Sequence, residues 1–266
     1  MPRGTSISDT AFLQRRLWTP DVLRPDAWFD ASDLSTVTVA TGVSEWRDKS
    51  GKNNHASQAI GTSQPALRQG DLNGHSVLRF DGSDDFLTCS TWSQTITSQS
   101  SFALFKIAAH SGFYGRVYTQ TSGSSGDTAY VQCLEWVGTA QYGSYIAGTN
   151  AGDALSKIAL STGVWYLWSS IHDGAAIQNR TTKLTGSSSA STINISLSTL
   201  RIGDEINSTS VPAFNGDFAE LLIFNNVGSS LRDRQMIEGY LAHKWGLSSE
   251  LLASHPFANR PPLIGD

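Results

Sequence analysis

The sequence predicts an all-β protein, an antiparallel two-sheet sandwich of the jelly-roll type with one amphipathic helix near its C-terminus. Short runs of β-branched and aromatic residues recur along the 266 residues, and turns rich in Gly, Ser, Asn and Asp separate them. One long stretch, between Ser230 and Gly246, has the apolar spacing of a helix that packs on a sheet. Helices do not alternate with the strands, as a parallel sheet would require, so the strands are expected to pair antiparallel.

The strongest pair of elements lies between Phe214 and Leu247. Residues 217–224 are an apolar and aromatic run, which predicts a buried strand. Ser230 is placed to cap the helix that follows, because its hydroxyl can accept a free backbone N–H of the first turn, and Gly246 suits the left-handed residue that ends it. The apolar face of this helix comprises Met236, Ile237, Tyr240, Leu241 and Trp245. This amphipathic helix is therefore expected to cover a β-sheet.

The chain is expected to divide into an N-terminal arm at 1–19, one jelly-roll domain at 20–260 and a C-terminal tail at 261–266. The arm is predicted to carry its candidate docking residues on a short helix: Phe12, Leu13, Arg15, Arg16 and Leu17. Two alternatives stay open for this helix, which either packs on its own domain or docks onto a partner subunit. Within the domain, further strands are predicted at 28–33, 36–39, 43–46, 76–80, 102–108, 116–119, 129–133, 157–160, 164–168 and 200–203.

The composition argues against several classes of function. Lys and Arg number 19 against 23 Asp and Glu, a net charge of −4, so the chain lacks the basic excess that nucleic-acid binding needs. No apolar run reaches the roughly 18 residues of a membrane span, and residues 1–6 show no secretory h-region. Cys89 and Cys133 form either one disulfide or two buried thiols, and the sequence leaves both alternatives open.

Four motifs, taken in order along the chain, resemble a known family. They lie at 28–33, at 46–51 with 54–56, at 78–82 with 84–87, and at 216–224 with the helical segment 239–247. Together they are similar to the laminin-G-like, concanavalin A-like lectin/glucanase jelly rolls found in bacterial surface proteins and in tailed-phage virion proteins. The resemblance implies a concanavalin A-like jelly roll and, through its phage members, a virion protein made in the host cytoplasm.

The resemblance also implies calcium, which members of this superfamily often hold at a sheet rim. The hard oxygen donors for such an ion are Asp81, Asp84, Asp85, Asp217 and Glu220. The alternative is that these acids belong to tight turns and satisfy loop amides. Apart from calcium, the sequence indicates no cofactor.

The sequence predicts that the chain is not an enzyme. Retaining glycoside hydrolysis needs two carboxyls about 5–5.5 Å apart, and the related glucanases place them on alternate residues of one strand, in a Glu-x-Asp-x-Glu pattern. None of the six glutamates lies in that pattern, and the adjacent Asp204 and Glu205 would point to opposite faces of a strand. The histidines show no metal-ligand spacing, and neither Gly-x-Ser-x-Gly nor a phosphate loop occurs.

Aromatic residues in the middle of the chain are candidates for binding a glycan or a partner. Exposed rings stack on sugars, and loops rich in Gly and Ser make adaptable recognition surfaces. The candidate residues are Tyr118, Tyr130, Trp136, Tyr142 and Tyr145. The alternative is that these rings belong to the core of the sandwich.

The function that the sequence favours is structural: a non-enzymatic capsid decoration (cement) protein, or a tail or fibre component, of a phage virion. Such a protein would form a homo-oligomer, contact other virion proteins through its arm and tail, and bind neither nucleic acid nor a membrane. A lectin-like module that recognises carbohydrate on a host surface is the alternative function, and a glycoside hydrolase is the third.

Overall fold

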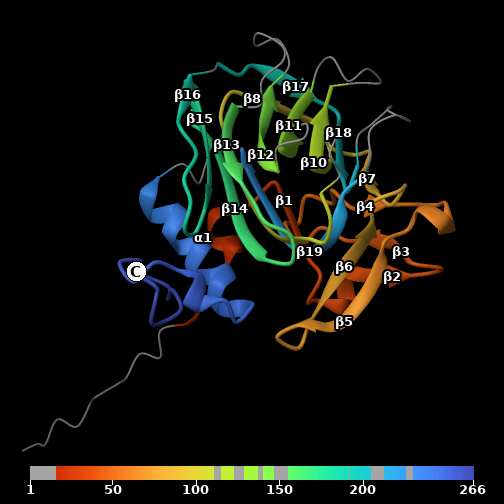
Figure 1. Cartoon of the computed structure of the whole chain (residues 1–266), viewed down its shortest axis with the longest axis horizontal. Helices are drawn as coiled ribbons and strands as arrows, with labels where there is room; N and C mark the ends of the chain where they lie inside the picture. Colours follow the sequence, from red (N-terminus) through yellow and green to blue (C-terminus); the bar gives the residue numbers. More distant parts are fainter. Residues whose placement is uncertain are drawn as a thin grey trace, which may run out of the picture.

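The structure of the chain is a computed structural model that describes residues 16–110, 115–122, 129–136, 140–146, 155–190, 192–204, 213–225 and 230–266. Within these residues the chain forms two large antiparallel sheets, a small ribbon and one α-helix near the C-terminus (Figure 1). The predicted all-β sandwich with a C-terminal helix is confirmed.

The first large sheet, called the helix-covered sheet, has eight strands in the described residues. Its order is β16 (Ser189–Ala190), β15 (Ala176–Thr181), β14 (Trp165–His172), β9 (Gln99–Ile107), β19 (Asn215–Asn225), β6 (His75–Asp81) and β5 (Ala66–Leu72), and β1 (Ala27–Asp30) also pairs with β19.

The second sheet has nine described strands: β13 (Leu155–Ala159), β12 (Gln141–Ile146), β11 (Ala129–Trp136), β10 (Arg116–Thr121), β18 (Thr199–Ile202), β7 (Leu87–Cys89), β4 (Ala56–Ser57), β3 (Val43–Trp46) and β2 (Val37–Val39). β17 (Ile195–Leu197) and β8 (Gln94–Ile96) form the ribbon, and the α-helix is α1 (Leu231–Lys244). Short 3₁₀ turns occur at Pro20–Leu23, Leu34–Thr36, Gly61–Ser63 and Ser248–Glu250.

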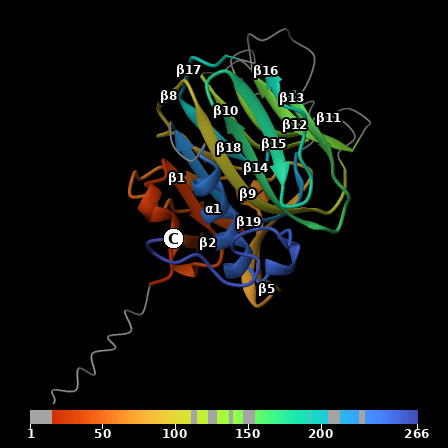
Figure 2. The ribbon, with the colours of Figure 1, turned by 90° about the vertical axis from the view of Figure 1, so that its left-hand side faces the viewer.

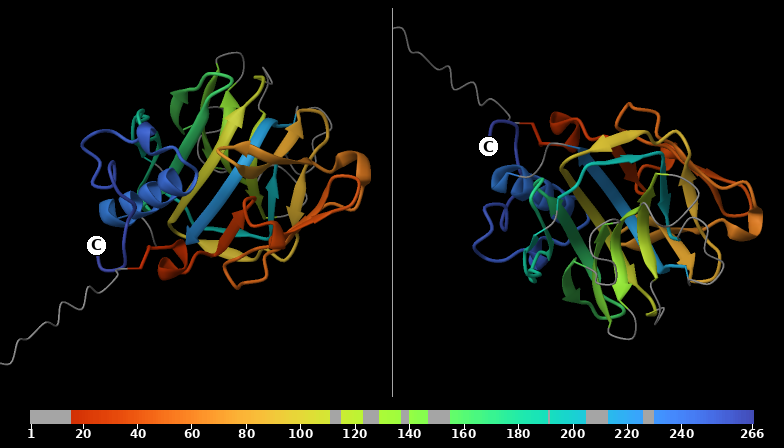
Figure 3. Two further views of the ribbon diagram at one scale, coloured as in Figure 1. Left: turned by 90° about the horizontal axis from the view of Figure 1, so that it is seen from below. Right: turned by 90° about the horizontal axis from the view of Figure 1, so that it is seen from above.

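The main core lies between the two large sheets, whose layers are seen in Figure 3. Phe218 of β19 lies in the middle of an aromatic group, with its ring centroid 6.1 Å from that of Trp46 and 6.3 Å from that of Phe105. Such tilted and edge-on contacts add about 0.5–1.5 kcal/mol per pair beyond the burial of the rings. Cys89 belongs to this core as a free thiol, whereas the side chain of Cys133 lies outside the described part of the chain.

A second apolar layer lies on the other face of the helix-covered sheet, beneath α1. Its buried side chains include Trp28, Phe224, Tyr240 and Trp245. Figure 2 looks onto this side, where α1 and the C-terminal residues lie over the sheet. β19 is therefore buried on both faces, which explains why its sequence is apolar almost throughout.

The two ends of α1 have the capping chemistry that the sequence predicts. Ser230 Oγ accepts the backbone N–H of Asp233 at 3.0 Å, which satisfies one of the free donors of the first turn. Gly246 follows the helix with a φ of 67°, in the left-handed region that glycine adopts without strain. In the described part of the chain no helix combines the length and the apolar character that crossing a membrane takes.

The described end of the predicted arm, residues 16–19, pairs with the predicted tail. The backbone N–H of Trp18 donates to the carbonyl of Pro262 at 3.0 Å, and that of Ile264 donates to the carbonyl of Arg16 at 2.9 Å. Trp18 is buried, with its ring centroid 6.2 Å from that of Tyr240 in α1. Trp18 therefore belongs to the same packed layer as α1.

Of the predicted docking residues in the arm, two are described and both are exposed. Leu17 has 62 % of its surface exposed, and Arg16 is exposed beside it. Phe12, Leu13 and Arg15 lie outside the described residues. Docking of the arm onto a partner subunit therefore stays a prediction.

Candidate functional site

The aromatic residues predicted to bind a glycan do not gather on one described surface. Tyr118 is wholly buried and Tyr142 is only 2 % exposed, and both belong to the core between the sheets. A sugar cannot stack on rings inside a packed core, so the prediction is wrong for these two residues. Tyr130, Trp136 and Tyr145 lie on β11 and β12, but their side chains are outside the described residues, and their role stays a prediction.

The five predicted calcium donors separate into two groups. Asp217 and Glu220 lie on β19 and are wholly buried. Asp217 is bound by Arg79 and by Lys106, whose Nζ lies 2.8 Å from Oδ2. Glu220 is bound by four donors of the protein itself. The prediction is therefore wrong for these two carboxylates, because protein groups already neutralise and hydrogen-bond them.

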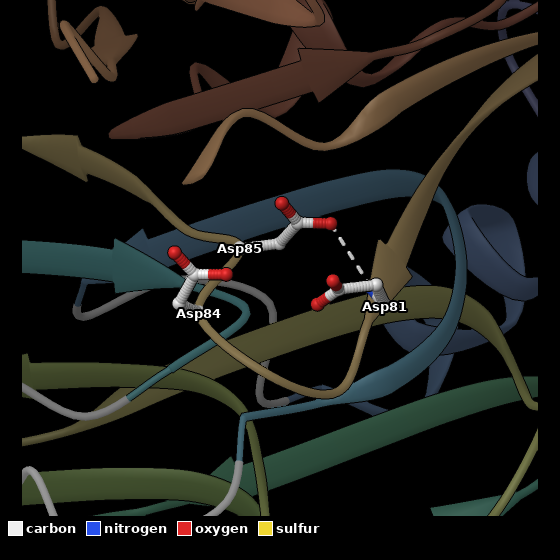
Figure 4. Close-up of side chains that lie close together, drawn as sticks. All are labelled: Asp81, Asp84 and Asp85. Atoms are coloured by element: carbon white, nitrogen blue, oxygen red, sulfur yellow. Dashed lines mark hydrogen bonds between the residues drawn. The ribbon is translucent and has the colours of Figure 1, made fainter. Parts of the chain in front are cut away.

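The other three acids form a cluster at the turn after β6 (Figure 4). One carboxylate oxygen each from Asp81, Asp84 and Asp85 lies within 4.8 Å of the others. Asp85 Oδ2 accepts the backbone N–H of Asp81 at 3.0 Å, and Ser63 Oγ donates to Asp84 Oδ2 at 2.6 Å. Burial raises the pKa of Asp85 to about 6, and the charges of the two neighbouring aspartates add to the rise. Calcium binding at these three acids stays a prediction.

Replacing Asp85 with Asn is expected to stabilise the protein at neutral pH and not at acid pH. The pKa of Asp85 is about 6 in the folded protein and its ordinary value is 3.8, so its ionisation opposes folding above pH 6 and this penalty vanishes below its ordinary value. This pKa difference corresponds to about 3 kcal/mol, and solvent screening at the turn reduces it. The free energy of unfolding, measured with urea across this pH range, is therefore expected to rise by about 1–2 kcal/mol at pH 7.

If Asp85→Asn raised the free energy of unfolding equally at acid and at neutral pH, burial of the charged carboxyl would not be the cause. Repeating the urea unfolding in the presence of calcium chloride tests the calcium prediction. A bound ion would stabilise the native chain at pH 7 and the Asn variant less, because Asn carries no charge for the ion to neutralise.

A buried charged cluster centred on Glu220 links α1 to the helix-covered sheet, and we call it the Glu220 hub. Glu220 Oε2 accepts Lys244 Nζ and Trp245 Nε1, each at 2.6 Å. Lys244 Nζ also lies 2.7 Å from Asp30 Oδ1, and Lys49 Nζ lies 2.8 Å from Asp30 Oδ2. Burial alone would raise the pKa of Asp30, but the two lysines outweigh it and lower that pKa to about 2. Two carboxylates from distant parts of the chain are thus held by one lysine.

A groove between β15 and α1, which we call the β15–α1 groove, is a polar recess in the described part of the chain. It consists of two hollows of about 250 and 220 Å³ that share Arg180 of β15 and Arg234 of α1. The first hollow is also lined by Ile171, Gln178, Ser188 and Leu231, and the second by Lys183, Glu238 and His255. Together the two hollows reach the lower end of the range of about 300–1,000 Å³ that is typical of ligand sites.

The two arginines of the β15–α1 groove are incompletely satisfied. Arg180 donates to Gln178 Oε1. Arg234 Nε is buried without a hydrogen-bond partner, and Glu238 Oε1 lies 3.7 Å from it, beyond hydrogen-bond distance. Burial lowers the pKa of Arg180, and the positive charge of Arg234 lowers it further against the opposing effect of Glu238. The groove therefore presents donors and positive charge that the protein itself does not fully use.

Comparison with known proteins gives the fold and no family. No protein-family model and no curated protein sequence matches the chain. Trypanosoma rangeli sialidase, solved in complex with sialic acid, is similar with a TM-score of 0.56 and 11 % identity, over 82 % of this chain and 33 % of the sialidase chain. Domain 4 of AbnA, a GH43 extracellular arabinanase from Geobacillus stearothermophilus in complex with arabinotriose, has a TM-score of 0.53 and 10 % identity, over 75 % of this chain and 91 % of that domain. The receptor-binding domain of botulinum neurotoxin type G has a TM-score of 0.51 and 11 % identity, over 79 % of this chain and 50 % of that one.

These likenesses correct the prediction that the chain is not an enzyme. A sialidase and a domain of an arabinanase share its fold, so the fold is one that glycoside hydrolases contain. The chain spans about a third of the length of the sialidase chain. The prediction failed because a search for carboxylates at alternate positions of one strand sees only close neighbours in sequence.

Proposed function

We propose that the chain is a carbohydrate-binding domain with a glycoside-hydrolase-like fold, and that the β15–α1 groove holds its ligand. The observation that carries the proposal is the groove itself, where polar groups from a strand and a helix converge on a recess with aliphatic walls. Sugars need this combination, because their hydroxyls require hydrogen-bond partners and their C–H faces pack on apolar side chains.

The comparisons support the class of ligand. Domain 4 of AbnA was solved with arabinotriose, and the likeness covers 91 % of that domain. The sialidase was solved with sialic acid. Carbohydrate recognition is therefore the function for which both the recess and the fold give an argument. A structural role in a phage virion, a homo-oligomer and virion partners stay predictions.

Blocking the groove tests the proposal. Leu231 lines the first hollow and is 60 % exposed. Leu231→Trp is therefore expected to fill the recess without disturbing the packing of the core. Affinity for an oligosaccharide found on a glycan array is expected to fall roughly tenfold or more by calorimetry, because one or more polar contacts of the sugar are lost. Ile60→Trp is the matched control, since Ile60 is equally exposed and lies away from the lining residues.

Two results would overturn the proposal. One is an array without hits for the native chain. The other is equal affinity of the native chain and the Leu231→Trp variant, which would place sugar binding elsewhere. The array ligands are also assayed for release of reducing sugar, because enzymes share the fold.

A further inference from the structure

We propose that the β15–α1 groove selects anionic sugar residues, whose carboxylate or sulfate is held between Arg180 and Arg234. This inference rests on the carbohydrate binding proposed above and names the class of sugar. It begins from the position of the two arginines, one on β15 and one near the start of α1, both of which line the same recess.

The charges that line the groove leave these two guanidinium groups without full counter-charges. Lys183 Nζ is paired with Glu250 at 2.6 Å. Asp173 Oδ1 accepts two backbone N–H groups of its own turn, those of Ala175 and Ala176, each at 2.9 Å. Among the described residues, neither Glu250 nor Asp173 makes an ion pair with Arg180 or Arg234.

The carboxylate closest to the arginines is itself shared. Glu238 Oε1 lies 3.7 Å from Arg234 Nε, while its Oε2 lies 3.2 Å from His255 Nε2. Among the described residues Arg180 makes no ion pair, and its side-chain hydrogen bond goes to the neutral amide of Gln178. An anion between the two guanidiniums would relieve their mutual repulsion and would supply the buried Arg234 Nε with an acceptor.

The rest of the recess suits a sugar that carries the anion. Guanidinium groups bind carboxylate and sulfate oxygens in pairs, which fixes the orientation of the ligand. The N-terminus of α1, whose first residue Leu231 lines the first hollow, adds the positive end of a helix dipole. Gln178 and Ser188 offer neutral donors and acceptors to hydroxyls, and Ile171 offers an apolar wall.

The test compares ligands that differ in charge and little else. The probes are trigalacturonic acid, its fully methyl-esterified form, and a sulfated and an unsulfated galactose trisaccharide, each titrated into the full chain by calorimetry. The acidic member of at least one pair is expected to bind about tenfold or more tightly than its neutral form, because charge-assisted hydrogen bonds are lost in the neutral one. The two pairs distinguish a carboxylate from a sulfate as the anion.

Variants assign that preference to the arginines. Arg180→Gln and Arg234→Gln are each expected to remove the preference for the acidic probe, whereas Arg68→Gln, an exposed arginine on β5, is expected to keep it. Arg180→Gln is expected to melt at the same temperature as the native chain or higher, because it removes a partly buried charge beside a like charge. A lost preference in a fully folded variant is then a binding effect.

The outcomes separate this inference from the proposed function. Equal binding of the acidic and neutral members of both pairs overturns the selection of anions and leaves carbohydrate binding in place. Absence of binding to every sugar overturns both. A preference that survives in Arg180→Gln and Arg234→Gln overturns the assignment to these arginines.

Discussion

Replacing Lys244 with Met is expected to lower the free energy of unfolding by about 3–5 kcal/mol. Lys244 Nζ is the cation that Glu220 and Asp30 share, at 2.6 and 2.7 Å. Met keeps most of the volume but leaves Glu220, which is wholly buried, without a counter-charge. The loss is expected to be largest at neutral pH and to shrink in acid, because protonation of Glu220 removes the uncompensated charge. Urea unfolding followed by tryptophan fluorescence across this pH range measures it.

The matched control for Lys244→Met is Lys183→Met. Lys183 pairs with Glu250 at the same distance of 2.6 Å, but the two side chains are 52 % and 39 % exposed, so the loss is expected to be at most about 1 kcal/mol. A double variant, Lys244→Met with Glu220→Gln, is expected to recover part of the stability, because it also removes the buried negative charge that Lys244→Met alone leaves unpaired. Equal losses for the two lysine variants, or no recovery in the double variant, would show that the Glu220 hub does not fasten α1.

Local patterns in the sequence were sufficient for the sandwich and for α1. The apolar run of β19 and the caps at Ser230 and Gly246 depend on residues a few positions apart, and the structure confirms them. β5 was missed because most of its side chains are exposed, so it lacks the alternation that marks a half-buried strand. A short-range pattern identifies an element only when that element has at least one buried face.

The site residues depended on information that the sequence does not carry locally. The resemblance places Glu220 among the calcium donors because its carboxylate is a hard oxygen ligand. A bulge between Phe218 and Glu220 shifts the alternation of side chains, so that Glu220 faces the helix while Phe218 faces the main core. Arg180 and Arg234 likewise meet only because α1 packs beside β15. Neither a bulge nor the meeting of two distant segments has a signature in a window of a few residues.

The packing around β19 also leads to the second large effect, which is expected for Gly216→Ala. Gly216 is buried in the middle of the helix-covered sheet, where it pairs with Phe80 of β6 and with Ile107 of β9. A Cβ atom there would lie 2.2 Å from the backbone oxygen of Lys106 and 2.5 Å from the ring of Phe214. That oxygen belongs to β9, the strand beside β19, and cannot retreat without disturbing the sheet. The free energy of unfolding is expected to fall by about 3 kcal/mol.

Gly61→Ala separates this close contact from the general effect of adding a methyl group at a glycine. The nearest atoms to its Cβ would be those of the Thr41 side chain, with Oγ1 at 2.8 Å, and Thr41 is exposed, so this side chain can shift slightly. The change in the free energy of unfolding is therefore expected to stay within about 0.5 kcal/mol. Thermal and urea melts of both variants decide the matter. If Gly216→Ala is as stable as Gly61→Ala, then β19 is not held between β6 and β9 as closely as described. The bulge beside it would then lose its role in turning Glu220 toward α1, because that role needs a strand whose register is fixed on both sides.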